Sequence, residues 1–244
     1  MTYLSIFEKI KEDIIKHPYL ELIECQFNPG LSEAELENLK TELYQCIDYF
    51  QSIDMKAIYK FYRECNGLTL SWRIASHLDE KEYLELKEKL PNFTFPYTRD
   101  LEIGKIKILP FEEVFLYEQD YFDTSSSGDH FTQFNDYIYN GNSFGKMLFI
   151  FDLFSETSCM SFVPDEDNKE PKVIFLSDYY IVWNNSRITF FDSYINFLAV
   201  TRGLIESRKQ FFDYFRGDTK EAIMFKKKYN TDLEPSLFKI FNHH

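Results

Sequence analysis

Residues 58–74, IYKFYRECNGLTLSWRI, pass from a helical pattern to a strand pattern through an Asn-Gly pair. The predicted helix, for which Asp54 is a candidate cap, has one apolar face made of Ile58, Phe61, Tyr62 and Cys65. Glycine has no Cβ, so Gly67 suits the left-handed residue that follows many helices. We therefore predict that this helix stops at Asn66 and Gly67.

The next residues alternate as in a half-buried strand, with Leu68, Leu70 and Trp72 on one face. The turn before them is expected to let Trp72 cover the sheet beneath the helix. We interpret Asn66, Gly67 and Trp72 as an architectural joint and assign them no catalytic role.

Two helices are predicted upstream of the joint. Residues 3–16 form an amphipathic helix that ends near His17 and Pro18. The second helix begins at a capping box, in which Ser32 and Glu35 satisfy each other's backbone N–H groups. Its predicted buried stripe is Leu36, Leu39, Leu43, Cys46, Ile47 and Phe50.

Downstream, strand patterns dominate. An exposed helix is predicted at 79–90, and helical sequence resumes at residue 192. The predicted strands are 68–74, 105–109, 147–153, 157–163, 172–177 and 179–184. This order predicts an α+β fold in which residues 1–244 form one domain. Its central antiparallel sheet of about six strands would be flanked by N-terminal and C-terminal helices packed on one side.

The chain is acidic, with 27 Lys and Arg against 40 Asp and Glu and a net charge of −13. This charge argues against a nucleic-acid partner, because nucleic-acid binding requires cations to neutralise phosphates. An acidic surface that only keeps the protein in solution is an alternative. Residues 202–244 differ, since their nine basic and six acidic side chains give +3.

The cysteines and the apolar runs bear on location. The four cysteines show no C-x-x-C pair, so free, buried thiols in a reducing compartment are expected. No apolar signal segment opens the sequence, and no apolar run is long enough to span a bilayer. We expect a cytoplasmic protein without a membrane partner.

The motifs that resemble active sites lack the spacing or the residues that those sites need. GNSFGKM, residues 141–147, has three residues between its glycines and Met147 after the lysine, whereas a P-loop needs four and Ser or Thr. Asp129 and His130 are interpreted as a solvated loop, because no metal-binding spacing accompanies them. We therefore predict no catalytic residue, no metal and no cofactor. Carboxylates that meet only in the fold could still act as acid and base.

No Lys or Arg occurs between Lys107 and Lys146, where seven acids lie among tyrosines and phenylalanines. Tyrosines beside carboxylates are typical of protein-recognition surfaces. The predicted partner-binding residues are Glu118, Asp120, Tyr121, Asp123, Asp129, Asp136 and Tyr137. The alternative is that this segment only covers an edge of the sheet.

The order of elements resembles that of the SUKH superfamily, the Smi/Knr cell-wall-regulator and bacterial immunity-protein group. The matching features are the SEAEL helix start at 32–36, the helix stop at Asn66 and Gly67, the strand with Trp72, and the later strands GKIKILP, IFDLFSETSCMSFVP and KVIFLSD. The resemblance covers about 31–205, with insertions near 76–103 and 118–145 and a C-terminal helical extension. The chain has QSIDMKAI where the family often has Leu-Pro.

The resemblance implies a non-enzymatic immunity protein that binds and neutralises a cognate bacterial toxin. A nuclease-like, basic toxin would suit the acidity of the chain. The alternatives are a regulatory scaffold of the Smi/Knr type and an enzyme that uses carboxylates.

Overall fold

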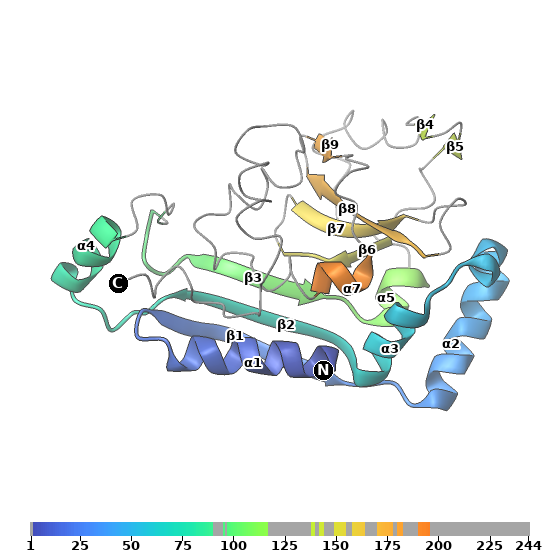
Figure 1. Ribbon diagram of the computed structural model, residues 1–244, viewed down its shortest axis with the longest axis horizontal. Helices are drawn as coiled ribbons and strands as arrows, with labels where there is room; N and C mark the ends of the chain where they lie inside the picture. Colours follow the sequence, from blue (N-terminus) through green and yellow to red (C-terminus); the bar gives the residue numbers. More distant parts are fainter. Residues whose placement is uncertain are drawn as a thin grey trace.

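The computed structural model describes residues 2–89, 95, 97–116, 138–139, 142–143, 149–154, 158–163, 170–177, 180–182 and 190–195. Within these residues the chain forms a seven-stranded antiparallel sheet with helices packed against it (Figure 1). The strand order is β1-β2-β3-β6-β7-β8-β9. The predicted α+β fold is therefore confirmed.

The elements follow in chain order. The helices are α1 (Tyr3–Lys16), α2 (Glu33–Cys46), the 3₁₀ helix η1 (Asp48–Ser52), α3 (Lys56–Glu64), α4 (Glu80–Lys89), α5 (Phe111–Phe115) and α7 (Phe191–Ser193). The strands are β1 (Leu20–Pro29), β2 (Cys65–Ile74), β3 (Glu102–Ile108), β6 (Phe149–Asp152), β7 (Ser158–Val163), β8 (Lys172–Ser177) and β9 (Tyr180–Val182). Separately, β4 (Ile138–Tyr139) pairs with β5 (Asn142–Ser143).

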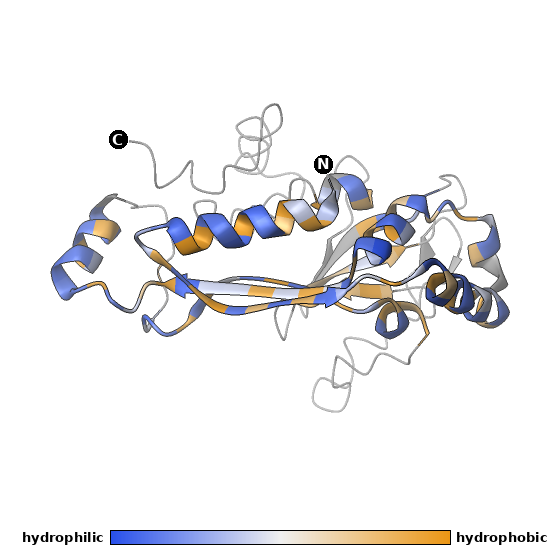
Figure 2. Ribbon diagram, turned by 90° about the horizontal axis from the view of Figure 1, so that it is seen from below, coloured by the Kyte–Doolittle hydropathy of each residue, from blue (hydrophilic) through white to orange (hydrophobic). Residues whose placement is uncertain are grey.

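Helix α1 has the predicted boundaries and covers β1 and β2 (Figure 2). Its first turn is capped because Thr2 Oγ1 accepts a hydrogen bond from Ser5 N–H at 3.2 Å. Phe7, Ile10 and Ile14 are fully buried on the side that faces the strands. The apolar spacing thus places this helix on the sheet.

The capping box of α2 is confirmed. Ser32 Oγ accepts from Glu35 N–H at 3.3 Å, and Glu35 Oε2 accepts from Ser32 N–H at 2.8 Å. The predicted stripe is wrong at Cys46, whose side chain is exposed. The helix ends there because Ile47 leaves helical geometry with φ −142°. The following 3₁₀ turn then carries Phe50 into the core.

The expected helix stop lies two residues earlier than predicted. Helix α3 ends at Glu64, and Cys65 already has extended geometry and pairs with Pro29 of β1. Gly67 therefore lies inside β2, where it adopts φ +87°. A Cβ on Gly67 would lie 2.8 Å from Pro110 N, so the close approach of the chain after β3 excludes a side chain here.

Six strands of the sheet, all except β1, correspond to the six predicted strands. Strand β1 was missed, although its ten residues pair along most of β2. A β-bulge between Leu22 and Glu24 shifts the alternation by one residue, so the strand has no uniform period of two.

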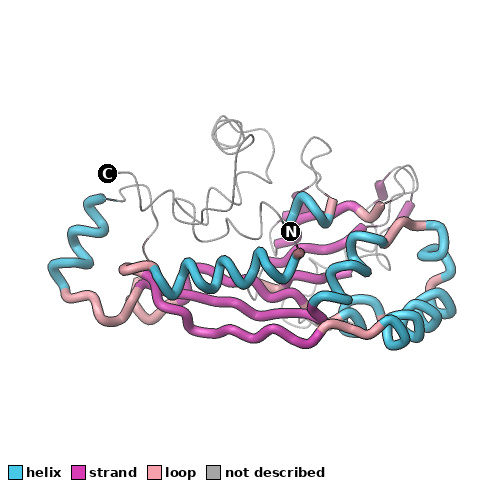
Figure 3. Tube along the Cα trace, turned by 60° about the horizontal axis from the view of Figure 1, so that its bottom comes forward, coloured by secondary structure: helices cyan, strands magenta, loops and turns pink. Residues whose placement is uncertain are grey.

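The helices do not all pack on one side as predicted. Helices α1, α3 and α7 meet on one face, where the rings of Tyr3, Phe61 and Phe191 have centroids 5.4–5.9 Å apart. Helices α2 and α4 instead lie at opposite ends of the sheet (Figure 3). The fold thus presents α2, η1, α3 and α5 together at one end.

Candidate functional site

Residues 33–64 and 111–115, which include α2, η1, α3 and α5, lie at one end of the sheet and are here called the acidic end. They are rich in carboxylates. Its nine acidic residues are Glu33, Glu35, Glu37, Glu42, Asp48, Asp54, Glu64, Glu112 and Glu113. Its four basic residues are Lys40, Lys56, Lys60 and Arg63. The acidic residues exceed the basic ones by five, which makes this end attractive to a cation-rich partner.

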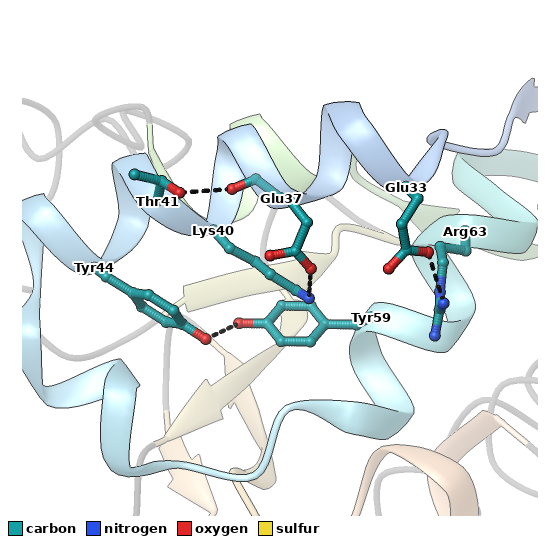
Figure 4. A network of polar contacts seen from close by, with 7 residues as sticks. All are labelled: Glu33, Glu37, Lys40, Thr41, Tyr44, Tyr59 and Arg63. Atoms are coloured by element: carbon teal, nitrogen blue, oxygen red, sulfur yellow. Dashed lines mark hydrogen bonds and ion pairs between the residues drawn. The ribbon is translucent and has the colours of Figure 1, made fainter.

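Two of the four cations are held between α2 and α3 (Figure 4). Arg63 Nη1 lies 2.9 Å from Glu33 Oε2. Lys40 Nζ lies 2.5 Å from Glu37 Oε1 and 4.4 Å from the centroid of the Tyr59 ring. The Tyr44 and Tyr59 hydroxyls are 3.1 Å apart, and burial raises the pKa of Tyr59.

The other two cations also have partners within the protein. Lys56 Nζ is 2.9 Å from Asp54 Oδ2, and this hydrogen bond raises the pKa of Lys56. Lys60 Nζ lies 5.0 Å from the centroid of the Tyr3 ring. Each of the four cations at this end therefore has a partner within the protein, while Glu42 is exposed.

Asn66 fixes α5 to the joint between α3 and β2. Its Oδ1 accepts from Phe111 N–H at 2.9 Å, and its Nδ2 donates to Glu112 Oε2 at 3.2 Å. Its backbone carbonyl accepts from Asn28 Nδ2 at 2.9 Å. Asn66, one of the residues assigned from sequence to an architectural joint, thus positions Glu112, the first acid of the Lys107–Lys146 segment.

Two phenylalanines, one on each side of the undescribed residues of that acidic segment, lie at the acidic end and are here called its anchors. Phe115 precedes the undescribed residues and Phe149 follows them, and their ring centroids are 5.5 Å apart. Phe50 of η1 contacts both rings, at 5.6 and 4.9 Å. Both anchors therefore lie beside η1.

The predicted partner-binding residues Glu118, Asp120, Tyr121, Asp123, Asp129, Asp136 and Tyr137 lie outside the described residues. The contacts of Lys40 and of Arg63 with α2 and α3 had not been predicted. They join residues far apart in sequence, and only the i,i+3 spacing of Glu37 and Lys40 was a local signal.

Trp72, the third residue of the predicted joint, is fully buried in β2 opposite Gly104 of β3. In the described part of the chain its indole N–H has no hydrogen-bond partner. Cys65 is also buried, and burial raises its pKa to about 11. Both side chains belong to the interior of the fold.

Within the described ranges, no group of three or more His, Cys, Asp or Glu is placed to hold a metal ion. No helix in the same ranges is long and apolar enough to cross a membrane. Neither a protein-family model, nor a curated protein, nor a solved structure matches the chain.

Proposed function

We propose that this chain is a non-enzymatic protein that binds a basic protein partner. The observation that carries the proposal is the composition and position of the acidic end: its acidic residues outnumber its basic ones by five, and both anchors of the acidic segment lie there, beside Phe50. Complementary charge speeds association with a basic protein, and tyrosines in the segment supply contact area.

The specific role we propose is that of a cytoplasmic immunity protein that neutralises a cognate bacterial toxin. The SUKH-like order of elements supports this role. Nuclease-like toxins suit the charge, since proteins that bind nucleic acid are usually basic.

The test begins with the gene next to the one that encodes this chain. Its product is expressed in cells with and without the chain, and the expected result is growth arrest that the chain relieves. A stable complex with a non-toxic neighbour would favour the regulatory scaffold of the Smi/Knr type instead.

Surface plasmon resonance at two salt concentrations then tests the surface. Reversing Asp120, Asp123 and Asp129 to Lys should slow association and flatten its salt dependence, because charge steers encounter over about 8 Å at physiological salt. Tyr121→Ala or Tyr137→Ala should instead quicken dissociation. A folded triple variant with unchanged rates would show that the segment is not the interface.

A matched control reverses three acids at the opposite end of the molecule. Glu80, Glu85 and Glu88 are exposed on α4, and changing them to Lys alters the net charge by the same amount. The proposal expects a much smaller effect on association from this control. Equal effects would mean that only net charge matters.

The proposal also expects no enzymatic activity and no bound metal. Elemental analysis and screens for hydrolase and transferase activity check this. Stoichiometric zinc, or turnover abolished by one carboxylate substitution, would overturn the non-enzymatic assignment.

A further inference from the structure

The sheet consists of two blocks, β1–β3 and β6–β9, with a short junction between them. Strand β2 pairs with β3 from Leu68↔Ile108 to Arg73↔Glu102, and β7 pairs with β8 over six residues. Between β3 and β6, by contrast, the described residues contain the single register pair Ile108↔Asp152. Among the strand pairs of the described residues, the junction therefore has the fewest register pairs.

Asp152 stabilises this junction with its side chain. It is 0 % exposed, and its Oδ1 accepts a hydrogen bond from Lys107 N–H at 3.0 Å. Two backbone bonds flank it, Leu109 N–H to Phe151 O and Leu153 N–H to Lys107 O, both at 2.8 Å. The buried carboxylate of Asp152 thus accepts the backbone N–H that a backbone carbonyl would accept in a regular strand pair. The strand β6 is irregular next to it, between Ile150 and Asp152.

Residues 190–195, which include α7, contact the second block directly and the first block through α1 and α3, the helices that pack on β1 and β2. Tyr194 Oη donates to Asp152 Oδ2, and Tyr3 Oη of α1 donates to Asp192 Oδ1. The Phe191 ring contributes four further contacts. Its centroid lies 5.4–5.7 Å from the rings of Tyr3, Phe61, Phe151 and Phe162, which belong to α1, α3, β6 and β7.

We infer that residues 190–195 act as a strap that holds the two blocks in one orientation, and that the sheet bends at Ile108 and Asp152 when the strap is released. Bending would move Phe149, in the second block, relative to Phe115, which follows the first block. The strap would thus act together with the direct contacts of the Phe115 ring on Phe149 and Phe162 to set the spacing of the two anchors of the acidic segment. This inference does not depend on the identity of a partner.

Hydrogen exchange of the full chain tests the strap through Tyr194→Phe, which removes one hydroxyl. The amides of Lys107, Leu109 and Leu153 report on the junction, whereas the amide of Leu70 reports on the centre of β2. Loss of a buried hydrogen bond should speed exchange at the junction by roughly tenfold or more. Exchange at Leu70 should change by less than about twofold.

The matched control is Tyr44→Phe, which removes a hydroxyl from the pair with Tyr59 at the acidic end. It should leave exchange at the junction unchanged. If Tyr194→Phe does not fold, Tyr3→Phe releases the other end of the strap and is read in the same way. Unchanged exchange at the junction, or an equal increase at Leu70, would overturn the inference.

Bending itself is measured with spin labels on Cys46 and on Glu170→Cys, both exposed, in a Cys25→Ser background. Cys65 and Cys159 are buried and are not labelled in the native protein. The expected result is one narrow distance distribution for the parent and a broader or second one for Tyr194→Phe. Identical distributions would show that the strap does not control the orientation of the blocks.

Discussion

The indole ring of Trp72 lies against the backbone of Gly104, its partner in β3, and a Cβ on Gly104 would lie 2.1 Å from the ring. Because Trp72 is fully buried, it has little room to move away. We expect Gly104→Ala to lower the free energy of unfolding by about 1–3 kcal/mol, measured by urea denaturation.

The Trp72→Phe background provides the control, because the smaller ring leaves space for the added methyl group. In that background Gly104→Ala should cost clearly less, a non-additivity typical of residues in contact. The same cost in both backgrounds would show that the Trp72–Gly104 contact is not the cause.

Asn66 should contribute more to the free energy of unfolding than its half-buried position suggests. Asn66→Ala leaves Phe111 N–H without its acceptor and releases Glu112, so we expect a loss of about 1–3 kcal/mol in unfolding free energy. Gln26→Ala is the control. It removes an exposed hydrogen bond from the Gln26 side-chain amide to Asn28, and it should lower the unfolding free energy by less than about 0.5 kcal/mol. Equal losses would contradict the assigned role of Asn66.

The cysteines should differ in their rate of alkylation by iodoacetamide, followed by peptide mass spectrometry. Cys46 is exposed and should react first, and the half-buried Cys25 should follow. Cys65 and Cys159 are buried, and the raised pKa of Cys65 keeps it in the unreactive thiol form. They should react only on unfolding, and native Cys65 reacting as fast as Cys46 would refute this order.

The sequence predicted the helix boundaries of α1 and the capping box of α2 because both depend on local spacing and local hydrogen bonds. It did not predict β1, because the bulge near Ile23 combines two phases of alternation in one strand. It placed Cys46 on a buried face because the break at Ile47 and the 3₁₀ turn that follows have no Gly or Pro to mark them.

The candidate site was predictable only as a composition. The absence of Lys and Arg between Lys107 and Lys146 marks an acidic segment, but not its neighbours in space. That its anchors lie beside Phe50, and that Asn66 holds its first turn, depends on tertiary packing. The seven residues predicted to bind the partner remain a prediction.

The free energy of unfolding should decrease as the pH is lowered, because of His17, which follows α1. Its Nδ1 accepts from Tyr19 N–H at 3.1 Å, and burial lowers the pKa of His17 from 6.5 to about 4. The unfolded chain therefore takes up a proton below about pH 6.5 that the folded chain refuses until about pH 4. This linkage should remove about 1–3 kcal/mol of unfolding free energy between those pH values.

His17→Asn isolates the contribution of His17, because an amide oxygen can replace Nδ1 as acceptor but does not titrate. The difference in unfolding free energy between the two proteins should change between pH 6.5 and pH 4 and should be constant above pH 6.5. Glu21, whose pKa is lowered to about 2 by hydrogen bonds from Ser76 and Arg73, loses its own contribution below about pH 4.5, but it does so in both proteins and therefore cancels in the difference. Parallel pH profiles would exclude His17 as the cause.

Lys40 should contribute more to stability than an ordinary surface lysine. Its side chain is only 17 % exposed, and its ammonium group lies 4.4 Å from the Tyr59 ring centroid. Lys40→Met keeps the aliphatic contact but removes the charge, so we expect a loss of about 1–2 kcal/mol, the range for a partly desolvated cation–π contact. Amide exchange in α2 should rise with it, because this contact ties α2 to α3. Lys16→Met is the matched control, since the Lys16–Glu12 pair is 71 % and 63 % exposed and its loss should change the unfolding free energy much less than the loss of the Lys40 charge. A loss at Lys40 no greater than at Lys16, in parallel urea titrations, would show that α2 is held by its apolar contacts alone.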